Sequence, residues 1–319
     1  MLDVILQRPG LFGLSSPAPM SRYDIDGIAK ALRLSRDVTH NIRHGGRIRP
    51  MPSRDVLEAV VADLSASLFP SHYSQSESGA EAFDGFVCGT LSTALGLLEE
   101  QVRRGLTFTH DDLLSSEGLD HKALEITRAF ASKLPGIRVL LVEDLRAALE
   151  GDPAASSAPE ILLGYPGMAA LIHHRLAHAL YRLGSKLPAR LVADLARAKS
   201  GIDIHPAAQI GEGLFIDHGM GVVIGETAIV GRHVRLHQGV TLGARHATTG
   251  AELKALPRHP IVEDEVVIYA GATVLGRVTI GRGSIIGGNV CLTASVPPGS
   301  RIMPASVRGG CGDGQPPGE

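Results

Sequence analysis

The sequence of 319 residues contains no tryptophan and only 12 aromatic residues, 5 tyrosines and 7 phenylalanines. A core with so few rings must be built from aliphatic side chains, which together with aromatic residues supply most of the surface that folding buries. Hydrophobic residues still make up 44% of the chain, and charged residues make up 20%. These proportions are typical of a globular protein with a sizeable core, and they exclude a disordered chain.

Cysteine, long apolar runs and excess charge are also lacking. The 3 cysteines, Cys88, Cys291 and Cys311, form no C-x-x-C pair, so we expect no disulfide framework, no metal site and a cytoplasmic location. No apolar run approaches the roughly 20 residues that cross a bilayer, and the start MLDVILQRPGLFGLSSPAPM does not resemble a signal peptide. A net charge of −2 gives no broad cationic surface. We therefore expect neither membrane nor nucleic-acid partners.

The first two thirds of the chain have helical periodicity. In DGFVCGTLSTALGLLEEQVRRGL, apolar residues recur every three to five positions between Asp84, a capping residue, and Gly105. Further helices are expected at 120–133, 136–149, 167–183 and after Pro188. The polar stretch 70–82 is predicted to be a loop. We therefore expect a flexible lead-in over 1–20 and an α-helical oligomerisation and substrate domain over 21–200.

Glycine, by contrast, is abundant, and 22 of the 38 glycines follow residue 200. There, aliphatic residues recur every six positions at Val262, Ile268, Val274, Ile280, Ile286 and Leu292. A short strand and a turn give this period, and three such units close a triangular coil of about 18 residues. Coils stack about 4.8 Å apart as parallel strands, with glycine in the turns. The pattern predicts a parallel β-helix over 201–306 and a flexible tail over 307–319.

The six-residue period breaks twice. The step from Ile216 to Ile224 is two residues too long, which displaces the segment DHGMG at 217–221. The step from Leu242 to Val262 adds the loop ARHATTGAELKALPRHPI. Because insertions in a compact repeat are usually functional, we expect the chemistry at these two places.

Residues near the breaks have suitable chemistry. Asp203 and His218 are 15 residues apart, close to one coil, so they should lie near the same corner. A carboxylate beside an imidazole stabilises the imidazolium of a general base, and such a base acts on hydroxyl groups. Arg258 and His259 form a cationic pair suited to a carboxylate, and Asp217 suits an amine. On spacing alone, polar corner residues and a solvated loop face fit these residues as well.

Several motifs follow one another between residues 150 and 306. In order they are GDPA, GYPGMAALIHHRLAHALY, GIDIHPAAQIGEGLFIDHGMGVVIGETAIV, VTLG, RHP and IYAGATVLG. In this combination they resemble the serine O-acetyltransferase family, the first enzymes of cysteine synthesis from serine. The resemblance implies an N-terminal α-helical domain followed by a left-handed parallel β-helix of hexapeptide repeats. It also implies transfer of an acetyl group from acetyl-CoA, as co-substrate, to L-serine.

The resemblance also implies roles for individual residues. His218 matches the family's catalytic base, which deprotonates the serine hydroxyl, and Asp203 matches the carboxylate paired with it. Asp152 and Asp217 match the aspartates that hold the amino group and hydroxyl region of serine. The pair Arg258-His259 matches the group that binds the serine carboxylate. The attack is direct in this family, without an acyl-enzyme.

Further implications concern acetyl-CoA and partners. The backbone of Gly243, Ala270 and Gly288 matches positions that the family uses for acetyl-CoA, in a site between neighbouring subunits of a trimer. A homotrimer or a dimer of trimers is therefore expected. Cysteine synthase is a family partner, but the C-terminal isoleucine that docks into it is missing from the end GCGDGQPPGE. Gly243-Ala244 also replaces the family's Gly-Gly, and the loop before Arg258 is longer.

Alternatives from other classes remain open. Another hexapeptide-repeat acyltransferase would act on homoserine or a sugar acceptor, although the aspartates and the Arg258-His259 pair favour a small zwitterion. A zinc hydrase of the γ-carbonic-anhydrase type would draw on His233, His237 and His246, whose spacing is not a familiar ligand pattern. A non-catalytic scaffold subunit would not need the pair of Asp203 and His218.

Overall fold

The computed structural model describes residues 23–36, 50–73, 80–108, 115–245 and 256–304. The chain divides into two compact units, Met1–Arg49 and Pro50–Glu319. The described part of the first unit contains helix α1 (Ile25–Leu34), whose N-cap Asp24 accepts a hydrogen bond from the backbone N–H of Gly27 at 2.9 Å. The predicted lead-in over 1–20 and the predicted tail over 307–319 lie outside the described residues.

The second unit begins with helices. They are α2 (Arg54–Leu68), α3 (Pro70–Tyr73), α4 (Ala80–Leu106), α5 (Ser116–Ala131), α6 (Leu134–Gly151), α7 (Ala158–Gly164), α8 (Pro166–Arg182) and α9 (Lys186–Ser200). The expected loop at 70–82 is wrong at both ends, since it contains α3 and the start of α4. Proline is tolerated in a first helical turn, and the sequence AEA at 80–82 consists of strong helix formers. Asp84 therefore lies inside α4 and does not cap it.

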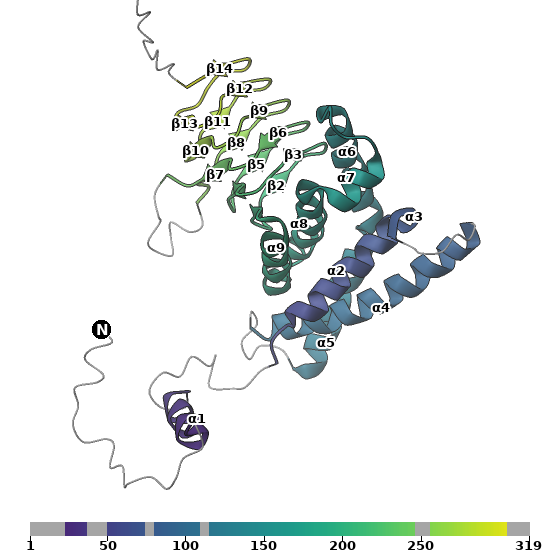
Figure 1. The fold of residues 1–319 in the computed structure, drawn as a ribbon. Coiled ribbons are helices and arrows are strands. Elements are labelled where there is room, and N and C mark those ends of the chain that lie inside the picture. Colours follow the sequence, from purple (N-terminus) through teal and green to yellow (C-terminus); the bar gives the residue numbers. More distant parts are fainter. Residues whose placement is uncertain (1–22, 37–49, 74–79, 109–114, 246–255, 305–319) are drawn as a thin grey trace, which may run out of the picture. The chain divides into compact units, whose positions relative to one another are not determined.

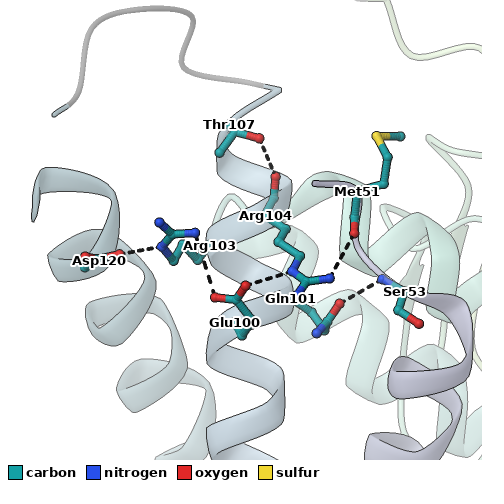
Figure 2. Close-up of polar contacts among 8 residues, drawn as sticks. All are labelled: Met51, Ser53, Glu100, Gln101, Arg103, Arg104, Thr107 and Asp120. Carbon is teal, nitrogen blue, oxygen red and sulfur yellow. Dashed lines mark hydrogen bonds and ion pairs between the residues drawn. The ribbon is translucent and has the colours of Figure 1, made fainter. Parts of the chain in front are cut away.

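Helix α4 is held by its neighbours through a buried aliphatic core and a polar margin. Leu98 and Val102 of α4 are almost completely buried. Figure 2 shows the polar contacts, in which Gln101 Oε1 accepts a hydrogen bond at 2.8 Å from the backbone N–H of Ser53, the N-cap of α2. Arg103 Nε donates to Asp120 Oδ1 of α5 at 2.5 Å. Exposed ion pairs contribute only about 0–1 kcal/mol, so buried area dominates the stability of this region.

The second half of the unit is a parallel β-helix with three faces (Figure 1). Face A contains β1 (Asp203–Ile204), β4 (Val223–Ile224), β7 (Thr241–Gly243), β10 (Thr273–Leu275) and β13 (Cys291–Leu292). Face B contains β2 (Gln209–Ile210), β5 (Ile229–Val230), β8 (Ile261–Val262) and β11 (Thr279–Ile280). Face C contains β3 (Phe215–Asp217), β6 (Arg235–His237), β9 (Val267–Ile268), β12 (Ile285–Ile286) and β14 (Arg301–Ile302).

The strand register confirms the six-residue repeat. Along face A the parallel pairing aligns Ile204, Ile224, Leu242, Val274 and Leu292 in one column. Each of these side chains is at most 9% exposed, because alternate residues of a strand point into the coil. N-terminal helices followed by a parallel β-helix are thus the architecture that the sequence predicts.

The turn from face C into face A, which we call the C–A corner, explains much of the glycine content. Gly239, Gly271 and Asn289 stack in this corner with φ of 73°, 71° and 60°. Residues that have a Cβ rarely adopt these positive φ angles. A Cβ on Gly271 would also lie 2.3 Å from Asn289 Oδ1. The turn from face A into face B is the A–B corner, and most of the second insertion, residues 246–255, lies outside the described residues.

Helices α6, α8 and α9 pack against the first coil, on which the chemistry was expected. Arg175 of α8 and Asp144 of α6 form a buried ion pair at 2.8 Å. Arg175 also donates to the carbonyl oxygens of Ile210 and Gly211, each at 2.6 Å, and Asp144 accepts from the backbone N–H of Leu214 at 3.0 Å. Removing one partner of such a buried pair costs about 3–5 kcal/mol, so this contact fixes the helices on the coil.

Candidate active site

The first break in the repeat presents His218 at the C–A corner. The register pairs Asp203 with Val223, twenty residues later, so the first coil is longer than the regular ones. His218 follows β3 with φ of 56°, and Gly219 and Gly221 also have positive φ. Non-glycine residues held in this region are concentrated at functional sites. The His218 side chain is 76% exposed, so its imidazole is accessible from outside the coil.

Asp217 lies beside this imidazole in a nearly buried position. Its Oδ1 is 3.8 Å from His218 Nε2, and its side chain is only 11% exposed. Its Oδ2 accepts a hydrogen bond from Arg235 Nη2 at 2.6 Å and lies 3.3 Å from His237 Nδ1. Burial lowers the pKa of His237, although the charge of Asp217 opposes this effect. A buried carboxylate requires a donor, and here Arg235 of the next coil supplies it.

Asp152 reaches the same corner from the end of α6. Its Oδ2 accepts from Tyr165 Oη at 2.7 Å and its Oδ1 accepts from the backbone N–H of Ala154 at 2.8 Å. These two bonds lower the pKa of Asp152, and the charges of Arg235 and His218 lower it further. The bond to Asp152 raises the pKa of Tyr165 to about 12. Asp152 is therefore an oriented anion facing the same corner as His218.

Asp203 lies at the start of β1 on the exposed side of face A, at the end of that face that adjoins the C–A corner. Its backbone N–H donates to Val222 at 2.8 Å. Among the described residues, no hydrogen bond or ion pair joins Asp203 to His218. The pairing of these two residues stays a prediction, and the structure adds Asp217 as a carboxylate next to the ring.

Arg258 and His259 lie at the A–B corner, just before β8. Arg258 Nη2 forms an ion pair with Glu226 Oε2 at 2.5 Å. The backbone N–H groups of Arg258 and His259 donate to Thr227 Oγ1 at 2.9 and 3.1 Å. His259 is 7% exposed, and its Nδ1 accepts from the backbone N–H of Thr227 at 3.1 Å. Burial lowers the pKa of His259, and because Nδ1 is an acceptor, the neutral form of the ring carries its proton on Nε2.

His205 extends this cluster toward the helices. Burial, together with the charge of Arg190, lowers the pKa of His205 to about 4, although Glu226 opposes the shift. The His205 ring meets the edge of Tyr181 of α8 with centroids 5.7 Å apart. Its Nδ1 accepts from the backbone N–H of Ala207 at 3.0 Å. The A–B corner thus consists of two histidines, each with its pKa lowered by burial, around the ion pair of Arg258 and Glu226.

The two corners lie at opposite edges of face A. His218 precedes the face A strand β4, whereas Arg258 and His259 follow the face A strand β7. One face of six residues measures on the order of 15–20 Å. The residues proposed for acetyl-CoA divide in the same way, with Gly243 at the A–B edge and Ala270 and Gly288 in the C–A corner. One chain therefore does not bring all the predicted site residues together.

Sequence reasoning missed several supporting residues of both corners. They are Tyr165, Arg235 and His237 at the C–A corner and His205, Glu226 and Thr227 at the A–B corner. The coil length was a usable signal for one of them, since the long first coil aligns His237 with Asp217. Tyr165 had no such signal, because its contact depends on how α7 and α8 meet the end of α6.

The alternative of a zinc site finds no support in the geometry. His233 lies in the turn before β6 with φ of 53°, His237 is the last residue of β6, and His246 is outside the described residues. Within the described ranges, no cluster of three His, Cys, Asp or Glu side chains is arranged to hold a metal ion.

Among the residues that the structure describes, no helix has the length and apolar character needed to cross a membrane.

Comparisons with known proteins agree on one family. The model of the bacterial transferase hexapeptide (six repeats) matches residues 259–294. A plasmid-encoded serine acetyltransferase of Synechococcus elongatus is 48% identical over 294 residues, which cover 90% of this chain and 92% of that protein. The serine acetyltransferase of Mycobacterium tuberculosis is 49% identical over 160 residues, 50% of this chain and 67% of that protein.

Solved structures give the same result. Serine acetyltransferase 1 of Entamoeba histolytica in complex with L-cysteine superposes with a TM-score of 0.68 at 32% identity, covering 87% of this chain and 95% of that one. Soybean serine acetyltransferase complexed with serine has a TM-score of 0.52 at 32% identity, covering 79% of this chain and 97% of that one. The similarity thus includes both the helices and the β-helix.

Proposed function

Because the chain belongs to the serine acetyltransferase family, we propose that it transfers the acetyl group of acetyl-CoA to L-serine, forming O-acetyl-L-serine and CoA. The observation that carries this proposal is the 48% identity over 90% of the chain, which extends through both corners described above. The reaction supplies an activated serine for cysteine biosynthesis.

His218 is the proposed general base. Its imidazole takes the proton of the serine hydroxyl while the oxygen attacks the thioester carbonyl carbon. The tetrahedral intermediate then collapses, the C–S bond breaks, and the imidazolium returns its proton to the sulfur of CoA. Asp217, 3.8 Å from the ring, and Asp203 stabilise the imidazolium. General base catalysis of this kind contributes about 10²–10⁴ in rate.

The charges of the two corners match the two ends of serine. Asp152 and Asp217 provide anions for the ammonium group, and Arg258 with His259 provides donors for the carboxylate. Serine spans only roughly 5 Å, far less than the width of face A, so one chain cannot hold both ends. We therefore place each site between the C–A corner of one chain and the A–B corner of another, with acetyl-CoA along the same cleft near Gly243, Ala270 and Gly288.

A site shared in this way requires a cyclic assembly. Three copies closing around a three-fold axis give three equivalent sites, and the helical region offers a second surface through which two trimers pair. Light scattering of the purified protein distinguishes three subunits from six. Cysteine synthase is a further partner to test, by co-purification, and we propose neither a nucleic-acid nor a membrane partner.

The proposed location is the cytoplasm. Cys88 and Cys291 are free thiols in the described part of the chain, as suits a reducing compartment.

A free-thiol assay of CoA release tests the reaction. Purified protein is incubated with acetyl-CoA and either L-serine, L-homoserine or glucosamine. We expect serine to give the highest kcat/KM, because the spacing of ammonium, carboxylate and hydroxyl is shortest in serine. A higher kcat/KM with homoserine or with the amino sugar would identify that compound as the substrate instead of serine. The protein would still be an acyltransferase. No thiol release with any acceptor would refute the proposed function.

A further inference from the structure

We propose that Arg235 is a positioning residue for this reaction, which sets the orientation of Asp217 and joins it to the segment that carries Asp152. The inference rests on the proposed function and goes beyond it, since the residues matched to the family do not include Arg235. The side chain lies on β6, in the coil that follows the one bearing His218.

The guanidinium group bridges two parts of the fold. Arg235 Nη2 donates to Asp217 Oδ2 at 2.6 Å, and Arg235 Nη1 donates to the carbonyl oxygen of Gly151 at 2.8 Å. Gly151 ends α6 and directly precedes Asp152. One side chain therefore ties together the two aspartates that we propose to bind the ammonium group of serine, although they come from different parts of the unit.

Packing fixes the plane of the guanidinium group. Arg235 is aligned with Phe215 in the register of β3 and β6, and its Cζ lies 5.0 Å from the centre of the Phe215 ring. The same ring leaves no room beside it, since a Cβ on Gly151 would lie 2.8 Å from Phe215 Cδ1. Arg235 Nε is buried without a hydrogen-bond partner in the described structure. The side chain thus keeps the two contacts of its terminal nitrogens although its Nε–H has no acceptor, which is energetically unfavourable.

His237 limits the rotation of Asp217 further. Its Nδ1 faces the same oxygen, Asp217 Oδ2, at 3.3 Å, and its ring stacks on Tyr269 with centroids 4.8 Å apart and planes at 13°. Arg235 donates to Oδ2 and the His237 ring lies beside that oxygen, so Oδ1 is left on the side of His218. The clamp therefore determines which carboxylate oxygen is available to a substrate.

Lysine cannot replace this arginine fully. The guanidinium fork serves Asp217 and Gly151 at once with fixed geometry, whereas an ammonium group is a single point on a flexible stem. Without the bridge, Asp217 is free to rotate and the end of α6 loses its contact with β6. The consequence is weaker serine binding with little change in acetyl-CoA binding.

Steady-state kinetics of Arg235→Met test the inference. We expect the KM for serine to rise about tenfold, the size of one charge-assisted hydrogen bond, while the KM for acetyl-CoA stays within twofold. The KM of Arg235→Lys for serine should lie between those of Arg235→Met and the wild type. Arg232→Met is the matched control, because Arg232 lies in the turn before β6, is largely exposed and is paired with Asp264 instead of a site residue.

A double-mutant cycle with Asp217→Asn decides whether Arg235 acts through Asp217. We expect the effect of Arg235→Met on the serine KM to shrink to less than threefold in the Asp217→Asn background. An undiminished effect there, or an unchanged serine KM in Arg235→Met, overturns the inference. If Arg235→Met does not fold, an unchanged serine KM in Arg235→Lys overturns it. A wild-type protein without any acetyl transfer to serine instead refutes the proposed function.

Discussion

The C–A and A–B corners of the first coils differ in their charged groups and in construction. The C–A corner presents carboxylates from Asp152 and Asp217 beside an exposed imidazole on a left-handed residue, His218. The A–B corner presents Arg258, paired with Glu226, next to a buried His259 whose pKa is lowered by burial. Face A separates them. Each corner carries half of the groups that a zwitterionic substrate needs, so the difference indicates a site completed by a second copy of the chain.

Loss of the base at the C–A corner should have the largest effect. We expect His218→Ala to lower kcat by a hundredfold or more while leaving the assembly intact. His218→Asn is the better matched variant, because asparagine tolerates positive φ and replaces the imidazole with a polar amide that is not basic. Initial rates of CoA release at saturating serine and acetyl-CoA measure the effect. Near-normal turnover in His218→Asn would contradict a general base at this position.

Loss of the cation at the A–B corner should weaken serine binding without removing the base. We expect Arg258→Met to raise the KM for serine roughly 10- to 100-fold, the range of a charge-assisted contact. The exposed Arg282, which faces Asp264 and Glu265, supplies the control Arg282→Met. A serine KM equal in the two variants would show that the A–B corner does not hold the carboxylate.

Mixing the two defects tests whether the corners come from different chains. Co-expression of His218→Asn and Arg258→Met chains in equal amounts should restore roughly a quarter of wild-type activity when serine is kept far below the KM of the Arg258→Met variant. The reason is that one site in four then combines an intact C–A corner with an intact A–B corner. Differently tagged chains allow mixed assemblies to be purified. Activity no higher than that of the single variants would place both halves in one chain.

The smallest expected effect concerns stability at the A–B corner. His205 has a pKa of about 4 in the fold and an ordinary value of 6.5 when unfolded. Between these values the unfolded chain binds more protons, so the free energy of unfolding rises with pH and falls on acidification from about 6.5 to 4. His205→Asn should reduce that slope by at most one proton, about 1.4 kcal/mol per pH unit. Denaturant titrations at pH 5 and pH 7 measure it, and an unchanged slope would contradict the shift.

Sequence periodicity was sufficient to predict the β-helix but not the side-chain contacts at its two corners. The six-residue spacing predicted the buried columns because inward and outward residues must alternate in a strand. Its two interruptions pointed to Asp217, His218, Arg258 and His259, all of which lie at corners. The contacts of Tyr165 and Arg235 could not be predicted, because the first depends on how α7 and α8 meet the end of α6 and the second on how that end meets β6. The loop predicted at 70–82 failed because local helix propensity continues through it.

The β-helix, its preceding helices and the candidate residues at each break of the repeat follow from the sequence, because period and burial are local consequences of strand geometry. That the candidates divide between two edges of one face, and that Asp217 is held between Arg235 and His237, is visible only in the folded chain. Coil stacking brings residues about one coil apart into contact, while face A keeps residues on either side of it apart. Distances across a face do not appear in the period of the sequence.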